Sequence, residues 1–349
     1  MRKLAKIVSI DSIHPIENAD AIEVAIVGGW KVVTKKGEYS VGDLAVYLEI
    51  DSWVPTELAP FLSKGKEPKE FNGVKGERLR TMRLRGQISQ GLLLSRLVAL
   101  NKVGEIHEDM DVTELLNIQK WERAPDTRSS EGFKANGKAK GSFPERIHKT
   151  DQERVQNIKR ELREAIESGE RFEVTEKMEG SSMTVYKIDG VFGVCSRNID
   201  LTRQFGNSFW DLAIRLNLEE KMAEYDNIAL QGELVGPGVQ GNIYGLPQHE
   251  FLLFDVFDVQ EAKYVLPPLR YTIGDELGLF HAPILHFSPT LKELGLETMD
   301  NVIDFADGDS DIPHGTTGLP VKREGVVFKS TTRDFSFKAI SNAYLLSEK

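Results

Sequence analysis

The segment TEKMEGSS, residues 175–182, contains the lysine on which the interpretation of the chain depends. Lys177 ends the β-like run RFEVTEKM (171–178), and Gly180 follows it closely. This pattern predicts a strand that ends in a glycine turn. A lysine ammonium is ordinarily a poor nucleophile, but burial or neighbouring cations lower its pKa and make the amine reactive. The segment alone is a weak signal, because Lys-x-Glu-Gly often occurs by chance.

Further motifs follow Lys177 along the chain, each with a charged or aromatic side chain near a predicted strand end. They are CSRN (195–198) with Arg197, GELVGPGVQGN (232–242) with Glu233, FLLFDVFD (251–258) with Phe254, EGVVFKS (324–330) with Glu324 and Lys329, and FSFKAIS (335–341) with Lys338.

These residue types suit the transfer of a nucleotide. A triphosphate needs cations to offset its charge, and Arg197, Lys329 and Lys338 can supply them. A divalent metal prefers oxygen ligands, which Glu179, Glu233 and Glu324 can offer directly or through water. A purine needs an apolar surface. We favour Phe254 over Phe257 for stacking, since at least one of these two alternating residues is expected to be core.

The first 115 residues predict a small β-barrel. Short β-branched runs are separated by turn signals such as Gly28-Gly29 and Gly42-Asp43, and about five strands in this length favour an OB-fold. The runs at 95–101 and 111–121 read as helices that close this module.

The remainder predicts an α+β domain with antiparallel sheets. Residues 116–142 form a linker, because 122–143 is rich in Gly, Ser, Ala and Lys and has no apolar period. An ordered surface loop is the alternative. A helix is expected over 150–169, and strands follow, including one at AIRLNL (213–218). The predicted domains are therefore 1–115 and 143–349.

A basic stretch lies within an acidic chain. The formal net charge is −10, yet residues 64–85 hold eight Lys or Arg against three Glu. Such a stripe can bind a phosphate backbone, because charges act over about 8 Å at physiological salt. The candidates for contact with nucleic acid are Arg78, Arg80, Arg83 and Arg85. A solvated strand edge is the alternative reading.

Composition narrows the setting. The single cysteine, Cys195, excludes an intramolecular disulfide and makes a cysteine-based zinc site implausible. This fits an intracellular location, in the cytoplasm or an organelle matrix. No apolar run of membrane-spanning length appears, and the first residues do not read as a signal peptide. We expect no membrane partner and a monomer by default.

The ordered motifs resemble those of the covalent nucleotidyltransferases, which comprise DNA ligases, RNA ligases and mRNA capping enzymes. KMEG (177–180) matches the lysine motif, with Glu179 where Asp is usual. Together with ADAIEVAIVGGWKVVTKKGEYSVGDLAVYLEIDS in the N-terminal half, and with SFPERIHKTDQERVQN (142–157), the chain resembles the Deinococcus/Naegleria type of ATP-dependent RNA ligase. That resemblance implies an OB-fold barrel followed by an adenylyltransferase (ATP-grasp-like ligase) domain.

The resemblance also implies a reaction and a set of roles. Lys177 would attack the α-phosphate of ATP, AMP would pass to a 5′-phosphate, and a 3′-hydroxyl would then seal RNA ends, in our reading at a nick in a duplex. Mg²⁺ or Mn²⁺ would assist. Lys329 and Lys338 would neutralise the α-phosphate, although Ser336 replaces the first lysine of the usual last motif. The cofactor-binding set is Glu176, Lys177, Arg197, Glu233, Phe254, Glu324, Lys329 and Lys338, and Glu179, Glu233 and Glu324 would position the metal and its waters.

Two other functions stay open from the sequence. A DNA ligase or a capping-type nucleotidyltransferase would share the motifs, but these enzymes usually carry the OB domain after the transferase domain. A non-catalytic OB-type RNA-binding protein would have no reason to retain Lys177, Glu233, Glu324 and Lys338 together. The adduct with labelled ATP and the preference for RNA ends distinguish these possibilities.

Overall fold

The computed structural model describes residues 3–122 and 139–348, which divide into two compact units. Unit 1 contains the described residues up to 122, together with 156–159 and 345–348. Unit 2 contains 139–155 and 160–344. The chain therefore contributes three separate segments to unit 1, although most of that unit is built from its first third.

Unit 1 is a β-structure of short strands. Its elements are β1 (Ala5–Ser9), β2 (Ser12–Pro15), β3 (Ile22–Val27), β4 (Trp30–Lys35), β5 (Leu44–Leu48), β6 (Ser52–Pro55), η1 (Pro60–Ser63), β7 (Lys69–Phe71), β8 (Val74–Arg78), β9 (Met82–Leu84), β10 (Gln87–Ser89), β11 (Leu92–Ser95), α1 (Leu97–Val103) and β12 (Gln119–Lys120). The strands form small antiparallel sheets in the orders β1-β5-β11, β2-β3-β4 and β12-β6-β8-β7, with β9-β10 as a hairpin. Buried aliphatic side chains such as Ile7, Val46 and Leu48 fill its core.

The two later segments of unit 1 are held by polar contacts to the strands. The Trp30 indole donates to Asn157 Oδ1 at 2.7 Å, and Asn157 Nδ2 donates to Glu49 at 3.1 Å. Near the C-terminus, Arg78 pairs with Glu348 at 2.8 Å. Sequence positions more than a hundred residues apart are thus joined in one unit.

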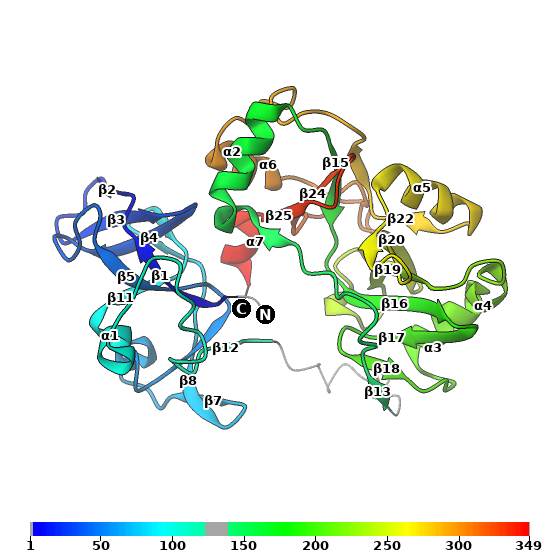
Figure 1. Cartoon of the computed structure of the whole chain (residues 1–349), viewed down its shortest axis with the longest axis horizontal. Helices are drawn as coiled ribbons and strands as arrows, with labels where there is room; N and C mark the ends of the chain where they lie inside the picture. Colours follow the sequence, from blue (N-terminus) through cyan, green and yellow to red (C-terminus); the bar gives the residue numbers. More distant parts are fainter. Residues whose placement is uncertain (1–2, 123–138, 349) are drawn as a thin grey trace. The chain divides into compact units, whose positions relative to one another are not determined.

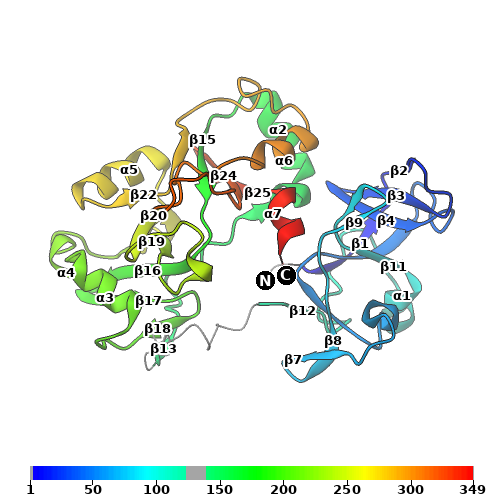
Figure 2. The same cartoon turned by 180° about the vertical axis from the view of Figure 1, so that it is seen from behind.

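Unit 2 carries two sheets, with helices beside them in Figures 1 and 2. Its strands and helices are β13 (Ala139–Ser142), β14 (Glu153–Arg154), α2 (Lys159–Ser168), β15 (Phe172–Lys177), β16 (Ser181–Ile188), β17 (Val191–Cys195), β18 (Ile199–Leu201), α3 (Ser208–Arg215), α4 (Leu218–Lys221), β19 (Ile228–Val235), η3 (Gln240–Asn242), β20 (Glu250–Asp258), β21 (Lys263–Tyr264), α5 (Pro267–Glu276), β22 (Phe280–His281), β23 (Ile284–His286), α6 (Met299–Ala306), β24 (Gly325–Ser330), β25 (Ser336–Ile340) and α7 (Asn342–Ser347), which runs on into unit 1; η2 (Val155–Asn157) joins the units' segments.

One sheet of eight strands runs β13-β18-β17-β16-β19-β20-β21, with β22 also paired to β20. The other has five strands in the order β14-β25-β24-β15-β23. Most pairings are antiparallel, and among the described residues the parallel ones are β14–β25 and β20–β22. The α+β class with mainly antiparallel sheets is therefore confirmed.

Several local predictions differ from the structure. The helix expected over 150–169 begins only at Lys159, because β14 pairs with β25 and η2 follows it. Residues 111–121 form turns and β12, and 213–218 spans the end of α3, a turn and the first residue of α4. The predicted linker falls mostly outside the described residues, but 139–142 at its end forms β13, which pairs with β18.

Within residues 3–122 and 139–348, every helix is too short or too polar to cross a lipid bilayer.

Candidate active site

Strand register brings the three predicted lysines onto one face of the five-stranded sheet. Lys177 on β15 pairs with Gly325 on β24, which pairs with Ile340 on β25. Lys329 lies four residues after Gly325 on β24, and Lys338 lies two residues before Ile340 on β25. Because side chains an even number of residues apart on a strand face the same side, all three lysines lie on one face of the sheet. The sheet therefore gathers motifs that are about 150 residues apart in the sequence.

Carboxylates surround Lys177. Its ammonium pairs with Glu324 at 2.7 Å, and its side chain is 28% exposed. Burial would lower the pKa of Lys177, but Glu324, Glu233 and Glu179 outweigh it and hold the pKa above its ordinary value. The sequence predicted a lysine made reactive by neighbouring cations. In the protein alone, the surroundings instead favour the charged ammonium.

Glu233 shares this environment on β19. Burial is the main cause that raises the pKa of its carboxyl to about 8. The negative charges of Glu324 and Glu179 raise this pKa further, whereas the positive charges of Lys177 and Arg197 lower it. Arg197 is exposed in the turn between β17 and β18, near enough to act on Glu233. The structure thus places Glu179, Glu233 and Glu324 around Lys177, and Arg197 near Glu233.

Gly180 permits the close approach of the two strands that carry this cluster. A Cβ atom at Gly180 would lie 2.5 Å from the carbonyl oxygen of Leu234 and 2.8 Å from Glu233 Cγ. Neither contact is sterically possible, and the first involves backbone that cannot move aside. Glycine is therefore required between Lys177 and β16 for a steric reason.

The acidic set suits a divalent cation held through water. Its three carboxyl groups place oxygen donors around Lys177, and a bound cation would favour the ionised form of Glu233, whose pKa is raised in the protein alone. Among residues 3–122 and 139–348, no group of three or more His, Cys, Asp or Glu side chains is close enough together to bind a metal directly. The donors fit a hydrated ion better than one bound by all three carboxylates.

An apolar cluster adjoins the lysine. Met178 packs with Tyr244, Leu252 and Ala282, and partly buried residues including Phe254 and Ile312 complete it. The Tyr244 hydroxyl accepts a hydrogen bond from the backbone N–H of Glu179 at 3.0 Å, which ties the cluster to the lysine motif. This surface could hold a purine.

The two candidate phenylalanines have different environments. Phe257 is fully buried in a core cluster with Phe143 and Tyr186. Phe254 is only partly buried and lies beside Met178's cluster. The preference for Phe254 as the stacking residue agrees with this difference in exposure.

Glu176 is held away from Lys177. Consecutive strand residues face opposite sides, and the Glu176 carboxylate accepts from Ser310 Oγ at 2.7 Å and from the Asp311 N–H at 2.5 Å. Burial raises the pKa of this carboxyl. Its side chain therefore fastens the 310–311 loop, while its backbone N–H donates to the carbonyl of Pro283 at 2.9 Å.

Asp151 and Arg154 were not among the predicted site residues. Lys338 pairs with Asp151 at 3.2 Å, and Arg154 on β14 is the register partner of Lys338 on β25. Arg154 is buried, with 6% of its surface exposed. The signal lay in TDQERVQN, which the sequence analysis used for the resemblance but interpreted as helix.

Lys329 occupies a different environment from the one predicted. Its ammonium pairs with Asp255 at 2.6 Å and donates to the carbonyl of Phe254, and its side chain is 8% exposed. Burial lowers the pKa of Lys329. In the protein alone the Lys329 ammonium is therefore engaged by Asp255 and by the Phe254 carbonyl, and its contact with the α-phosphate stays a prediction.

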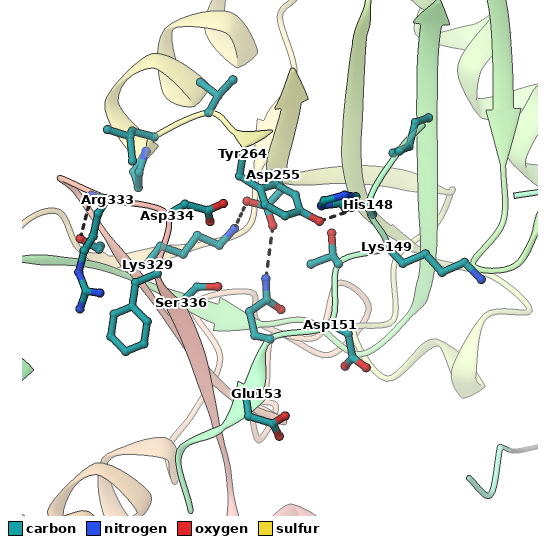
Figure 3. A pocket seen from close by; sticks show the side chains of 18 residues that line it. His148, Lys149, Asp151, Glu153, Asp255, Tyr264, Lys329, Arg333, Asp334 and Ser336 are labelled. Carbon is teal, nitrogen blue, oxygen red and sulfur yellow. Dashed lines mark hydrogen bonds and ion pairs between the residues drawn. The ribbon is translucent and has the colours of Figure 1, made fainter. Parts of the chain in front are cut away.

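A cavity of about 640 Å³ borders Lys329. Figure 3 shows Lys329 and Asp255 facing each other inside it, with Tyr264 and His148 on one side and Ser336 and Glu153 on the other. Its wall mixes acidic and basic side chains. Neither Lys177 nor Lys338 lines it, but Asp151, the ion-pair partner of Lys338, does.

The predicted arginine stripe does not form one face. Arg78 ends β8, with a side chain only 6% exposed that binds Asp51 at 2.6 Å and Glu348 at 2.8 Å and stacks over Trp121. Arg83 lies on β9, and Arg85 begins the turn to β10 with φ 48°. Arg83 and Arg85 are exposed and Arg80 is partly buried, so the candidates for nucleic-acid contact reduce to the residues at and near this hairpin.

Two family models match the chain. Residues 4–96 match an OB-fold domain family, which confirms the OB-fold predicted for the N-terminal part. Residues 170–340 match the RNA ligase family. A comparison with curated proteins gave no match.

Solved structures of an RNA ligase from Naegleria gruberi match nearly the whole chain. A substituted form with AMP and Mn is 42% identical, with 99% of this chain and 98% of the relative covered and a TM-score of 0.87. A second substituted form, with ATP and Mn, is also 42% identical, covers 98% of both chains and has the same TM-score. The form with PPi is 42% identical, with coverage of 99% and 98% and a TM-score of 0.84.

Proposed function

The chain belongs to the RNA ligase family and is an ATP-dependent RNA ligase that uses a divalent metal, and we propose that it acts through a covalent AMP adduct on Lys177. The observation that supports this most directly is the setting of Lys177. A single strand end places one lysine among three carboxylates and beside a partly exposed apolar cluster. That combination suits a nucleophile, a hydrated cation and a purine at one place.

In the first step, Lys177 Nζ attacks the α-phosphorus of ATP, and pyrophosphate leaves as the N–P bond forms. Glu324 holds the ammonium at 2.7 Å and is positioned to accept its proton. A divalent cation, Mg²⁺ or Mn²⁺, held through water by Glu179, Glu233 and Glu324, would offset the local negative charge and so lower the pKa of Lys177.

The other predicted residues bind the adenine, the α-phosphate and the ribose of ATP. Phe254, beside Met178, stacks on the adenine. Lys338 lies on the same sheet face as Lys177 and neutralises the α-phosphate, with Asp151 and the buried Arg154 supporting that end of β25. Exposed Arg197 reaches the ribose or nearby groups. These roles are the ones that the resemblance to the covalent nucleotidyltransferases implies, and the charge and exposure of the residues suit them.

In the later steps, a 5′-phosphate oxygen attacks the phosphorus of the lysyl adduct and Lys177 leaves. A 3′-hydroxyl then attacks the activated 5′-phosphate and AMP leaves, which closes the phosphodiester bond. We propose a nicked duplex containing RNA as the substrate, because an OB-fold unit joined to a transferase unit can hold a helix. We further propose a monomer acting inside the cell, which sedimentation and localisation measurements would test.

Labelling of the denatured protein tests the adduct. With α-labelled ATP and Mn²⁺ or Mg²⁺, we expect label on the intact protein and none on Lys177→Ala. The matched control is Lys187→Ala, since Lys187 also lies on a strand of unit 2 but binds backbone carbonyls at 222 and 223. Equal label on wild type and Lys177→Ala, or none on wild type with either metal, would contradict the proposal.

A further inference from the structure

A β-bulge in β20 sets the direction of Phe254. Gln231 on β19 pairs with Asp255, but the next residue, Gly232, pairs with Leu253, so Phe254 is an extra residue without a partner in the ladder. A bulge of this kind redirects side chains and interrupts the strand's hydrogen bonds. It therefore needs compensation from outside the strand.

The bulge also changes which residues face the core. Phe251, Leu253 and Val256 all enter the largest core cluster, so the spacing of core residues lengthens from two to three across the bulge. Phe254 and Asp255 consequently both project away from that cluster, although they are neighbours in the sequence. Phe254 joins the apolar cluster of Met178, and Asp255 meets Lys329.

Two buried cations satisfy the displaced backbone. The carbonyl of Phe254 accepts from Lys329 Nζ and from Arg270 Nη1, the latter at 3.1 Å. Arg270 is in turn held by Glu173 through two hydrogen bonds of 2.9 and 2.7 Å, and both side chains are almost fully buried. A carbonyl bound by two charged donors is fixed far more firmly than one in an ordinary ladder.

The residues that hold the Phe254 carbonyl come from three elements, and Glu173 acts through Arg270. Glu173 is on β15, four residues before Lys177, Lys329 is its register partner on β24, and Arg270 comes from α5. Figure 3 shows the Lys329 ammonium directed at Asp255. Lys329 is thus committed to the bulge, with 8% of its side chain exposed.

We infer that Lys329 is a positioning residue that fixes the Phe254 bulge, with Arg270 as its second support, and that it aligns the adenine without contacting phosphate. This inference rests on the proposed function, because it takes Phe254 as the surface on which adenine stacks. The Lys329 ammonium donates to both the Phe254 carbonyl oxygen and the Asp255 carboxylate, and so fixes the two groups relative to each other.

The test measures lysine adenylation against ATP concentration. Removing Lys329 alone would leave Asp255 buried without its charge partner, so the main variant is Lys329→Met combined with Asp255→Asn, which keeps a side-chain oxygen at 255. We expect the KM for ATP to rise about tenfold, the size of a lost base–aromatic stack, while kcat at saturating ATP changes less than twofold. Arg333→Met is the matched control, since its exposed cation follows the same strand but binds Glu170, and it should leave the KM unchanged.

A double-mutant cycle with Phe254→Leu identifies the route of the effect. If Lys329 acts through Phe254, adding Lys329→Met and Asp255→Asn to Phe254→Leu should raise the KM less than twofold further. Inhibition by pyrophosphate should be unchanged in every variant. Multiplicative effects on KM, or weaker inhibition by pyrophosphate in the Lys329 variant, would assign Lys329 to phosphate and overturn the inference.

Thermal unfolding separates these outcomes from loss of the fold. Should the combined variant unfold below the assay temperature, Arg270→Lys with Glu173→Gln removes the second support and must raise the KM for ATP in the same way. The wild-type result distinguishes the two claims. No label on wild-type protein would defeat the proposed function, whereas label on wild type with multiplicative effects would defeat only the role of Lys329.

Discussion

At the scale of single residues, the acidity around Lys177 has a cost in stability. Glu233 is largely buried near Glu324 and Glu179, and its pKa of about 8 means that its neutral form is favoured in the folded protein. An ordinary glutamate ionises near pH 4.5 when the chain is unfolded. The folded state is therefore stabilised by this group below pH 4.5, and that contribution is lost as the pH rises through 8.

Glu233→Gln should remove this pH dependence. Glutamine resembles the protonated acid, so we expect the variant to gain in melting temperature relative to wild type as the pH rises from 5.5 to 8.5. Each kcal/mol of relieved repulsion should add about 2–4 °C. Unfolding is followed by circular dichroism in metal-free buffer. A difference between variant and wild type that stays constant over this range would show that Glu233 does not titrate as described.

At the scale of elements, the arginines on the β9–β10 hairpin are exposed, whereas the arginine at the end of β8 is buried in ion pairs. Arg83 and Arg85 are exposed on the hairpin, whereas Arg78 is buried between Asp51 and Glu348. Arg83→Ala combined with Arg85→Ala should weaken RNA binding and reduce the dependence of log K on log salt by about 1 for each lost phosphate contact. Binding isotherms at several salt concentrations measure this.

Arg78→Ala supplies the contrast to the hairpin variant. It should lower the stability of unit 1 by about 1–3 kcal/mol, because two carboxylates lose their shared partner. The slope with salt should stay close to that of wild type. An unchanged slope in the hairpin variant, or a reduced slope for a stably folded Arg78→Ala, would reverse the assignment of these residues.

The elements also show how far the sequence could lead. The order of the motifs was enough to assign Lys177, Glu233, Glu324 and Lys338 to one candidate site, because each lies in a short motif on or beside a strand that the local sequence pattern predicts. Arg154 was missed since β14 is only two residues long and pairs with β25, more than 180 residues away. No local period encodes such a pairing.

The role of Lys329 could not be predicted for a related reason. It depends on the bulge at Phe254, which is a shift in register between β19 and β20. Most residues of FLLFDVFD are apolar, so the sequence alone does not show where the alternation of side chains changes. Arg78 likewise looked like part of a basic stripe, because its partners Asp51 and Glu348 are remote in the sequence. In both cases the sequence shows the charge of the side chain but not the residues that lie opposite it.

At the scale of the whole molecule, unit 1 is completed by segments from beyond the middle of the chain. Asn157 binds Trp30 and Glu49, Lys159 pairs with Asp11 at 2.8 Å, and Glu348 pairs with Arg78. The residues up to 122 therefore lack part of their polar framework when they stand alone.

A divided chain should consequently reassemble. We expect fragments 1–122 and 139–349, produced separately and mixed, to co-elute in size-exclusion chromatography and to bind more weakly when Asn157→Ala and Glu348→Ala are both present in the second fragment. Glu122→Ala and Arg160→Ala, one in each fragment, provide a surface control. Separate elution of the unmodified fragments at micromolar concentration would contradict this expectation.

The interleaving of these segments also bears on how such a gene could change. An exchange of the first 122 codons with those of another OB-fold would leave Asn157, Lys159 and Glu348 facing a surface that they do not match. A productive recombination would have to replace three separate stretches at once, or be followed by compensating substitutions in the two short ones. The two units should therefore be inherited together, and Trp30 with Asn157 and Arg78 with Glu348 should vary in step across lineages.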